Sequence, residues 1–254
     1  MRVWLFLCIF DLIKLRSMAK YIRTLTIQTD VDIHQNEIPL FRGAVISSLG
    51  EKANLLFHNH TEGNKLRYSY PLIQYKSLGK KAAIVCIEEG ADLIGQFLTE
   101  ANDKLRIGER ETEWSTRRMQ PARLLIQTWE DCFKYHISRW LPLNAKNYQL
   151  YQSAEGLVEK VALLENILKG NLLSMLKGLN IHLEQELIVK ITELSKPYIL
   201  YNKGIGMTAF NADFNCNLTI PNNVGIGKNA SIGYGIVHLE KKDRNNHNNN
   251  GESE

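Results

Sequence analysis

The sequence predicts an α+β protein built from two tandem domains, with a glycine-rich loop near the C-terminus. Twice along the chain, strand-like alternation of apolar and polar residues is interspersed with segments of helical periodicity. Four glycines crowd into the short stretch 225–235. The length of 254 residues suits two domains of about 100 residues each, which we place at 18–118 and 119–239.

Residues 1–17 imitate a secretion signal but lack its essential parts. An acidic residue, Asp11, interrupts the apolar run 3–10, no small-residue cleavage site follows, and the run is too short to cross a bilayer of about 30 Å. Met18 directly precedes a regular strand pattern. We therefore expect residues 1–17 to be a non-native extension, with translation starting at Met18 and no association with membranes.

The first domain carries the element order of a ferredoxin-like fold. Its opening segment alternates and is rich in β-branched residues, and the next segment repeats apolar residues every four positions after Pro39. Two further strand patterns, a helix and a weak strand follow, which gives the order β-α-β-β-α-β. The expected elements are a strand at 21–29, a helix at 39–50, strands at 66–76 and 82–88, a helix at 89–100 and a strand at 104–110.

The second domain repeats the alternation of strands and helix. Apolar residues that step by four and three predict a long helical region from 147 to about 178, with a break near Gly170. The asparagine-rich tail, 240–254, is too polar to bury a core and should be disordered. The strands of this domain are expected at 121–130, 135–143, 181–194, 206–219 and 231–239.

The composition indicates the compartment in which the protein works but says little about its function. A net charge of +4 is mildly basic, which permits a polyanionic partner and also suits many unrelated proteins. The four cysteines lie far apart and form no C-x-x-C pair, so neither a zinc knuckle nor a disulfide framework is indicated. We expect buried free thiols in a reducing, cytoplasmic compartment at Cys8, Cys86, Cys132 and Cys216.

The glycine-rich stretch has the composition of a phosphate-binding loop. Glycines remove side chains and permit positive φ, so the backbone of another molecule can approach exposed N–H groups. The stretch lacks the Lys-Ser or Lys-Thr pair of a P-loop and the helix of a dinucleotide fingerprint, which favours a polymer backbone as the anion. The alternative is a left-handed β-helix, since Ile220, Ile226 and Ile232 recur every six residues, but this period ends too soon to bury a solenoid core. The expected phosphate-binding residues are Gly225, Gly227, Lys228, Gly233 and Gly235.

His58 and His60, in the segment after the first helix, are candidates for catalysis. In an extended segment, residues two positions apart project from the same face, so both imidazoles can address one group. As a metal site the pair lacks a third ligand nearby, and we expect no metal. As a general acid and base, with pKa values of about 6.5, the pair suits cleavage of RNA by its own 2′-hydroxyl. The alternative is a structural pair that caps the helix or bonds to loop carbonyls.

A series of longer motifs occurs in a defined order along the chain: PLFRGAVISSLG, LLFHNH, RYSYPLIQYK, IVCIEEGADLI, RWLPLN, ENILKGNLLSMLKGL and then the glycine-rich stretch. Together they resemble the CRISPR-associated endoribonucleases of the Cas-six family, in particular its subtype-B branch, over residues 21–239. The resemblance implies tandem ferredoxin-like (RRM-like) domains. It also implies an endoribonuclease without metal or cofactor that cuts the repeat of precursor CRISPR RNA, leaving a 2′,3′-cyclic phosphate or 3′-phosphate and a 5′-hydroxyl.

By this resemblance the two histidines act as general base and general acid, in an order that stays open. The family also uses a lysine and a tyrosine, whose nearest matches are Lys52 and Tyr68, with Lys65 and Tyr70 as alternatives. The lysine would stabilise charge on the pentavalent phosphorane. RNA is expected in the cleft between the domains, against the glycine-rich stretch and the arginines Arg42, Arg117, Arg118 and Arg123.

The expected partner is CRISPR repeat RNA, and the sequence leaves open a homodimer and an association with an interference complex. Two other functions compete with the nuclease. An inactive homologue would bind and deliver the guide RNA without cutting it, but the histidine pair is intact. An unrelated enzyme would use the glycine-rich stretch for a nucleotide, but a Walker or Rossmann context is missing.

Overall fold

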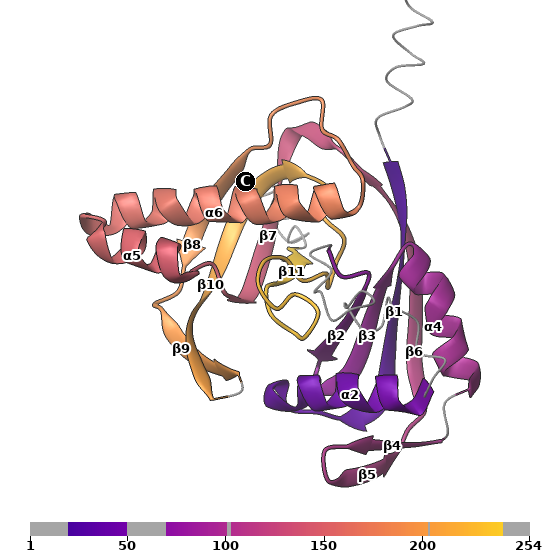
Figure 1. Ribbon diagram of the computed structural model, residues 1–254. Coiled ribbons are helices and arrows are strands. Elements are labelled where there is room, and N and C mark those ends of the chain that lie inside the picture. The colour runs from indigo at the N-terminus through magenta and orange to yellow at the C-terminus, as the bar shows by residue number, and fades with distance from the viewer. Residues whose placement is uncertain (1–19, 50–69, 101–102, 203, 241–254) are drawn as a thin grey trace, which may run out of the picture.

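The computed structural model describes residues 20–49, 70–100, 103–202 and 204–240. Within these ranges the chain forms two mixed α/β domains, each built on an antiparallel sheet that helices cover (Figure 1). None of the helices in this part of the chain is both long and apolar enough to cross a membrane.

The first domain has the ferredoxin-like arrangement that the sequence predicts. Its sheet has the strand order β2-β3-β1-β6, with β1 and β3 in the middle, and both of its helices contribute to one apolar cluster against this sheet. The elements are β1 (Lys20–Asp32), the 3₁₀ helix η1 (Gln35–Glu37), α2 (Ile38–Leu49), β2 (Ile73–Leu78), β3 (Lys81–Ile87), α4 (Glu89–Glu100) and β6 (Thr116–Ile126).

Two features of the sequence specify helix α2: a capping box just before it and a periodic apolar face. The backbone N–H of His34 donates to the Glu37 carboxylate at 2.8 Å, which forms a capping box just before the helix. Phe41, Val45 and Leu49 then recur every four residues and are buried on the face that meets the sheet. The predicted helix is therefore confirmed, and its buried face is the predicted one.

The last strand of the first sheet is not the predicted one. The segment expected to supply it, 104–110, instead forms β4 (Lys104–Ile107), which pairs with β5 (Arg110–Glu113) in a separate hairpin. Strand β6 pairs with β1 along nearly its whole length and takes the edge position. The residues from Thr116 to Arg123 are all exposed, so β6 lacks the apolar alternation by which a strand is recognised, and Pro121 is tolerated at an edge. The expected domain boundary at 118/119 falls inside β6.

The second domain repeats the strand order of the first. Its sheet runs β11-β7-β10-β8, so it is ferredoxin-like as well, with a loop in place of the second crossover helix. Strand β9, which the sequence analysis missed, pairs with the start of β10 as a hairpin. The elements are β7 (Thr128–Trp140), α5 (Ala145–Ser153), α6 (Gly156–Gly178), β8 (Val189–Leu194), β9 (Tyr198–Asn202), β10 (Ile205–Leu218) and β11 (Ile236–Leu239).

The long helical region is interrupted earlier than predicted. Ala154 ends α5 in an extended conformation, and α6 begins at Gly156 with φ of 82°. Gly170, where we expected the break, lies within α6 on its exposed side. The apolar stripe of α6, which includes Leu164, Leu168 and Leu172, is fully buried, so packing against the sheet holds the helix straight through this glycine.

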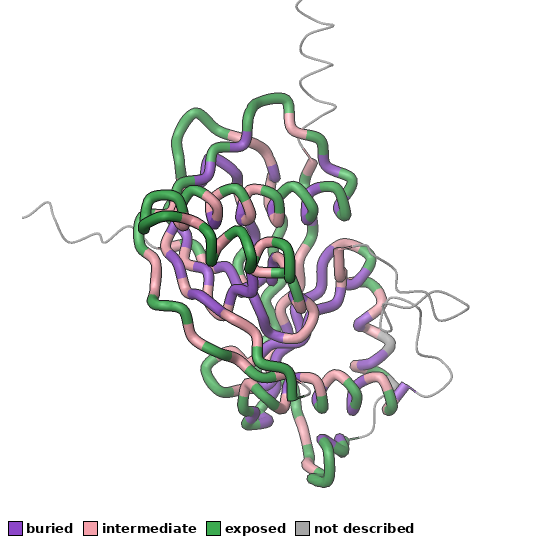
Figure 2. The backbone as a smooth tube through the Cα atoms, turned by 60° about the vertical axis from the view of Figure 1, so that its left-hand side comes forward, coloured by how far each residue is buried: buried purple, intermediate pink, exposed green. Residues whose placement is uncertain are grey.

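One apolar core joins the two domains. Ile22, Val85 and Ile87 of the first sheet belong to the same buried cluster as α6 and the strands of the second sheet. Figure 2 shows the buried segments gathered in the interior, with the outer turns of the helices exposed. Cys86 and Cys216 are buried free thiols, whereas Cys132 is exposed, contrary to our expectation, and Cys8 lies outside the described residues.

Candidate nucleic-acid interface

The glycine-rich loop, which we define as residues 219–235, connects β10 to β11 and pairs with both domains. A parallel bridge joins Ile232 of the loop to Tyr75 on β2, and an antiparallel bridge joins Gly225 to Ile236 on β11. The loop therefore lies at the junction of the two domains and is no free appendage of the second.

Side chains that β2 and the residues before it contribute hold this loop from the first domain. The Tyr70 hydroxyl donates to the carbonyl oxygen of Gly225 at 2.9 Å, and the Gly225 N–H donates to the side-chain oxygen of Gln74 at 2.7 Å. The ammonium of Lys76 donates to the carbonyl oxygen of Ala230 at 2.7 Å. These three contacts fix the conformation of the loop relative to the first sheet.

The glycines of the loop allow close approach by the protein's own atoms. A Cβ on Gly235, whose φ is 60°, would lie 2.0 Å from the carbonyl oxygen of Ile226. A Cβ on Gly225 would lie 2.5 Å from the Lys76 ammonium. A Cβ on Gly233 would meet the Ile38 side chain on α2 in the same way. The expectation that these glycines make room for RNA thus competes with an internal packing role, and their part in RNA binding stays a prediction.

The outward side of the loop is the part suited to an anion. Lys228 is exposed, and no acceptor within the described residues pairs with the backbone N–H groups of Gly227, Lys228 and Asn229. Gly227 and Asn229 both have positive φ, at 80° and 59°, and the exposed Lys228 lies between them. Backbone N–H groups in turns with such conformations can bind phosphates and other anions, and the lysine adds a positive charge.

The interior beneath the loop holds basic groups. Lys76 is fully buried, and burial lowers the pKa of its ammonium to about 7. His238 on β11 also has a lowered pKa, first through burial and then through the charges of His136 and Lys76. The sequence analysis missed Lys76 because Gln74 and Lys76 alternate with Ile73 and Tyr75 along the strand, a pattern that predicts exposed polar side chains.

A row of ionisable side chains crosses the second sheet. His238 on β11 is the direct partner of His136 on β7, which is the partner of Asp213 on β10, which in turn is the partner of Glu193 on β8. The His136 Nδ1 atom lies 2.5 Å from an Asp213 carboxylate oxygen. Residues so distant in sequence meet only through strand register, so no local motif could have predicted the row.

One group of side chains near this row has the donor atoms of a metal site. His136, Asp213 and Glu240 are the group of three in the described chain whose ligand atoms lie within 4.8 Å of one another. The Lys134 ammonium, however, lies 2.8 Å from Glu240 and 3.8 Å from Asp213. The carboxylates already have a cation, so the group is explained as an ion-pair network and we assign no metal to it.

The predicted arginines do not form one surface. Arg117, Arg118 and Arg123 are exposed on β6. The register with β1 is continuous from 118 to 123, so Arg118 and Arg123, an odd number of residues apart, lie on opposite faces of the sheet. Arg123 lies over the ring of Tyr21, with 4.6 Å between its guanidinium carbon and the ring centroid. Arg42 on α2 is half-buried and already makes contacts within the protein.

The predicted catalytic residues His58, His60, Lys52 and Tyr68, with the alternative Lys65, lie outside the described residues. The other alternative, Tyr70, is described and is engaged with the glycine-rich loop through its hydroxyl. Burial raises the pKa of Tyr70 well above the ordinary value of a tyrosine. Tyr70 therefore acts as a hydrogen-bond donor to the loop, directly after the undescribed residues 50–69 that contain the two histidines (the histidine segment).

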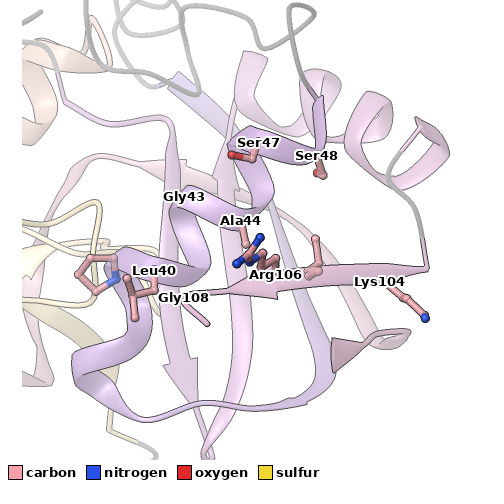
Figure 3. A pocket seen from close by; sticks show the side chains of 10 residues that line it. Leu40, Gly43, Ala44, Ser47, Ser48, Lys104, Arg106 and Gly108 are labelled. Atoms are coloured by element: carbon pink, nitrogen blue, oxygen red, sulfur yellow. The ribbon is translucent and has the colours of Figure 1, made fainter. Parts of the chain in front are cut away.

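A pocket of about 470 Å³ lies between α2 and β4, away from these groups in the fold (Figure 3). Small residues of α2, such as Gly43, Ala44 and Ser47, form one side, and Arg106 reaches toward them from β4 (Figure 3). Lys104 extends away and pairs with Glu111 at 3.3 Å. None of the described residues predicted for RNA binding lines this pocket, and we assign no function to it.

Comparisons with known proteins match both domains. The model of the Cas6b N-terminal domain matches residues 20–124, and the model of the Cas6b C-terminal domain matches residues 127–239. The two matches meet where β6 gives way to β7, at the boundary that the sheets define. A protein of Methanocaldococcus jannaschii is 39% identical over 109 residues, which are 42% of this chain and 73% of that protein.

Two solved structures are similar over most of the chain. A crystal structure of Cas6b has 25% sequence identity and a TM-score of 0.76, and the match covers 87% of this chain and 100% of that one. A crystal structure of the CRISPR RNA processing endoribonuclease Cas6b has 26% identity and a TM-score of 0.67, with the same shares of each chain covered. The similarity thus extends through both sheets and the loop between β10 and β11.

Proposed function

The chain belongs to the Cas6b family, and from this premise we propose that it processes precursor CRISPR RNA by cutting the repeat with general acid–base catalysis that needs no metal ion. The endoribonuclease activity is inferred from the match to both Cas6b domains. The pair His58 and His60 in the sequence supports the proposed mechanism, because histidine is the side chain best suited to act as base and as acid near neutral pH.

In the proposed reaction one imidazole removes the proton from the 2′-hydroxyl upstream of the scissile phosphate. The 2′-oxygen attacks phosphorus, and the second histidine, as imidazolium, donates its proton to the 5′-oxygen that leaves. The upstream product ends in a 2′,3′-cyclic phosphate, or a 3′-phosphate after hydrolysis, and the downstream product begins with a 5′-hydroxyl. Lys52 or Lys65 would stabilise the charge of the phosphorane, and Tyr68 is the proposed further member of the site.

The outward side of the glycine-rich loop is the proposed phosphate contact. The exposed Lys228 supports this assignment, as do the N–H groups of Gly227 and Asn229, for which the described residues provide no acceptor. Tyr70, where the chain emerges from the histidine segment, is hydrogen-bonded to the same loop.

The mechanism is tested with wild-type protein and a cognate repeat RNA. Cleavage is expected at full rate in excess EDTA, because no metal-bound hydroxide takes part. Deoxyribose at the single position upstream of the scissile phosphate should abolish cleavage and preserve binding, whereas deoxyribose one nucleotide downstream should leave the rate unchanged. Cutting of the upstream-substituted RNA at the same bond, or arrest of the wild-type enzyme by EDTA, would contradict the proposal.

The second candidate is an inactive homologue that binds CRISPR RNA and delivers it to an interference complex. It predicts tight binding of the repeat RNA without any cleavage in the same assay. Homodimerisation and association with an interference complex are separate proposals that light scattering and co-purification test. The presence of both histidines favours the enzyme over the inactive homologue.

A further inference from the structure

Lys76 is a fully buried lysine to which the proposed reaction gives no role. It lies on β2 and faces the glycine-rich loop, where its ammonium donates to the carbonyl oxygen of Ala230 at 2.7 Å. The space above it is closed, since a Cβ on Gly225 would lie 2.5 Å from the ammonium nitrogen. Removing an ammonium group from water costs free energy, so a buried lysine calls for an interaction that offsets this cost.

The described part of the chain supplies no counter-charge for this ammonium. Within the described residues, no carboxylate forms an ion pair with Lys76. The charge of Lys76 acts on His238 of β11, which also feels the charge of His136 on β7. The carboxylate next along this row, Asp213, is itself paired with His136. On the loop side, the Tyr70 hydroxyl bonds to Gly225, and Lys228 is exposed. An anion on the outer side of the loop would be the missing counter-charge.

We propose that Lys76 is a positioning residue that holds the glycine-rich loop through Ala230 and supplies positive potential to an RNA phosphate bound on the outer side of that loop. This inference rests on the proposed function, because it takes the ligand of the loop to be RNA. Lys76 does not touch the RNA, since it is fully buried. It acts on the bound phosphate through the backbone of the loop.

A phosphate on the loop and a proton on Lys76 stabilise each other. Burial lowers the pKa of the free ammonium to about 7, and the arrival of a phosphate raises it again, because an opposite charge favours the charged form. RNA binding at neutral pH therefore takes up a proton at Lys76. The contribution of Lys76 to affinity is largest below pH 7 and declines as the pH rises through the pKa of the bound state.

The test compares Lys76→Met, which keeps the length of the side chain, with Lys80→Met, which removes the same charge from the exposed turn between β2 and β3. Binding of uncleavable deoxy-substituted repeat RNA is expected to weaken about tenfold at pH 6.5 in Lys76→Met and by less than about twofold in the control. The deficit of Lys76→Met should shrink toward pH 9. With cleavable RNA the KM should rise while kcat changes little, and Lys76→Arg should restore part of the affinity.

A folded Lys76→Met variant with wild-type affinity, or with the same deficit at both pH values, would overturn the inference. If Lys76→Met fails to fold, NMR titration of ¹³Cε-labelled lysine in the wild-type protein decides. The pKa of Lys76 should rise by roughly one unit when RNA binds, and an unchanged pKa would overturn the inference. Failure of the wild-type protein to bind repeat RNA would instead overturn the proposed function itself.

Discussion

Gly235 shows how one residue limits the conformations of the glycine-rich loop. Its φ of 60° and the 2.0 Å between a built Cβ and the Ile226 carbonyl oxygen leave no room for a side chain. The sequence suggested that this glycine opens the loop to a ligand. The structure adds that the missing side chain lets the backbone at Gly235 pack directly against the backbone at Ile226. A substitution there is therefore expected to destabilise the fold, whatever its effect on binding.

Gly235→Ala should therefore lower the free energy of unfolding by about 2–4 kcal/mol, through backbone strain and the clash with Ile226. Gly170→Ala is the matched control, because Gly170 lies exposed within α6 with nothing near its Cβ position. It should raise the free energy of unfolding by up to about 1 kcal/mol. Urea denaturation measures both, and equal effects of the two substitutions would exclude the packing role of Gly235.

Removal of both histidines tests the chemistry at the residue scale. His58→Ala combined with His60→Ala should abolish cleavage of cognate repeat RNA and leave its affinity within a few-fold, because acid and base catalysis each contribute about 10²- to 10⁴-fold to the rate. His182→Ala, which removes an exposed imidazole of the second domain, is the control and should cut at the wild-type rate. A double variant that still cuts at full rate would disprove the assignment.

Lys76 also predicts how stability depends on pH. Its pKa is lowered to about 7 in the folded protein, so between pH 7 and the ordinary lysine pKa of about 10.4 the unfolded chain binds more protons than the folded one. Lys76 therefore destabilises the fold most below pH 7, and this penalty disappears as the pH rises. The free energy of unfolding of wild type minus that of Lys76→Met should increase from pH 7 to pH 10. A flat difference would show that the amine has an ordinary pKa.

At the scale of the element, the glycine-rich loop occupies the place that a crossover helix has in the first domain. A helix would satisfy its own backbone throughout, whereas the loop combines a few backbone hydrogen bonds of its own with contacts from Tyr70, Gln74 and Lys76 of the first domain. Within the described residues, the backbone N–H groups of Gly227, Lys228 and Asn229 have no acceptor. The exchange of a helix for a loop thus leaves N–H groups at which we propose that an anion binds.

Lys228→Ala tests this site without disturbing the fold, because the side chain is exposed. RNA affinity should fall, and the slope of log affinity against log salt should become shallower by about 0.7–0.9 if the lysine neutralises one phosphate. Lys146→Ala on α5 removes an equally exposed charge and is expected to change neither the affinity nor the slope. An unchanged salt dependence in Lys228→Ala would place the RNA elsewhere.

At the scale of the whole molecule, the two ferredoxin-like domains share an apolar core. Val85 and Ile87 of β3 pack in the cluster that contains Leu172 of α6 and Phe210 of β10. A core that crosses the domain boundary ties the unfolding of one domain to that of the other. The shared core therefore sets how the first sheet, with Tyr70, Gln74 and Lys76, lies relative to the second domain and its loop.

Thermal unfolding should therefore occur in one cooperative transition that fluorescence and circular dichroism report alike. Ile87→Ala should lower the free energy of unfolding by about 2–5 kcal/mol, because its side chain is fully buried between the domains. The transition should move as a single unit in this variant. Two separated transitions in either protein would show that the domains fold independently.

The strands and helices that bury one face were determined by the sequence itself, because periods of two and of 3.6 residues are local properties that short segments carry. For this reason β1, α2 and the stripe of α6 were predicted, and the ordered motifs identified the family. Only the tertiary structure decided the place of β6, since an exposed edge strand has no apolar period to read. The tertiary structure also brings together the ionisable row from His238 to Glu193, which depends on strand register. It likewise buries Lys76, which depends on the contact between the two domains. Such groups meet across long sequence separations, and no spacing within one segment records them.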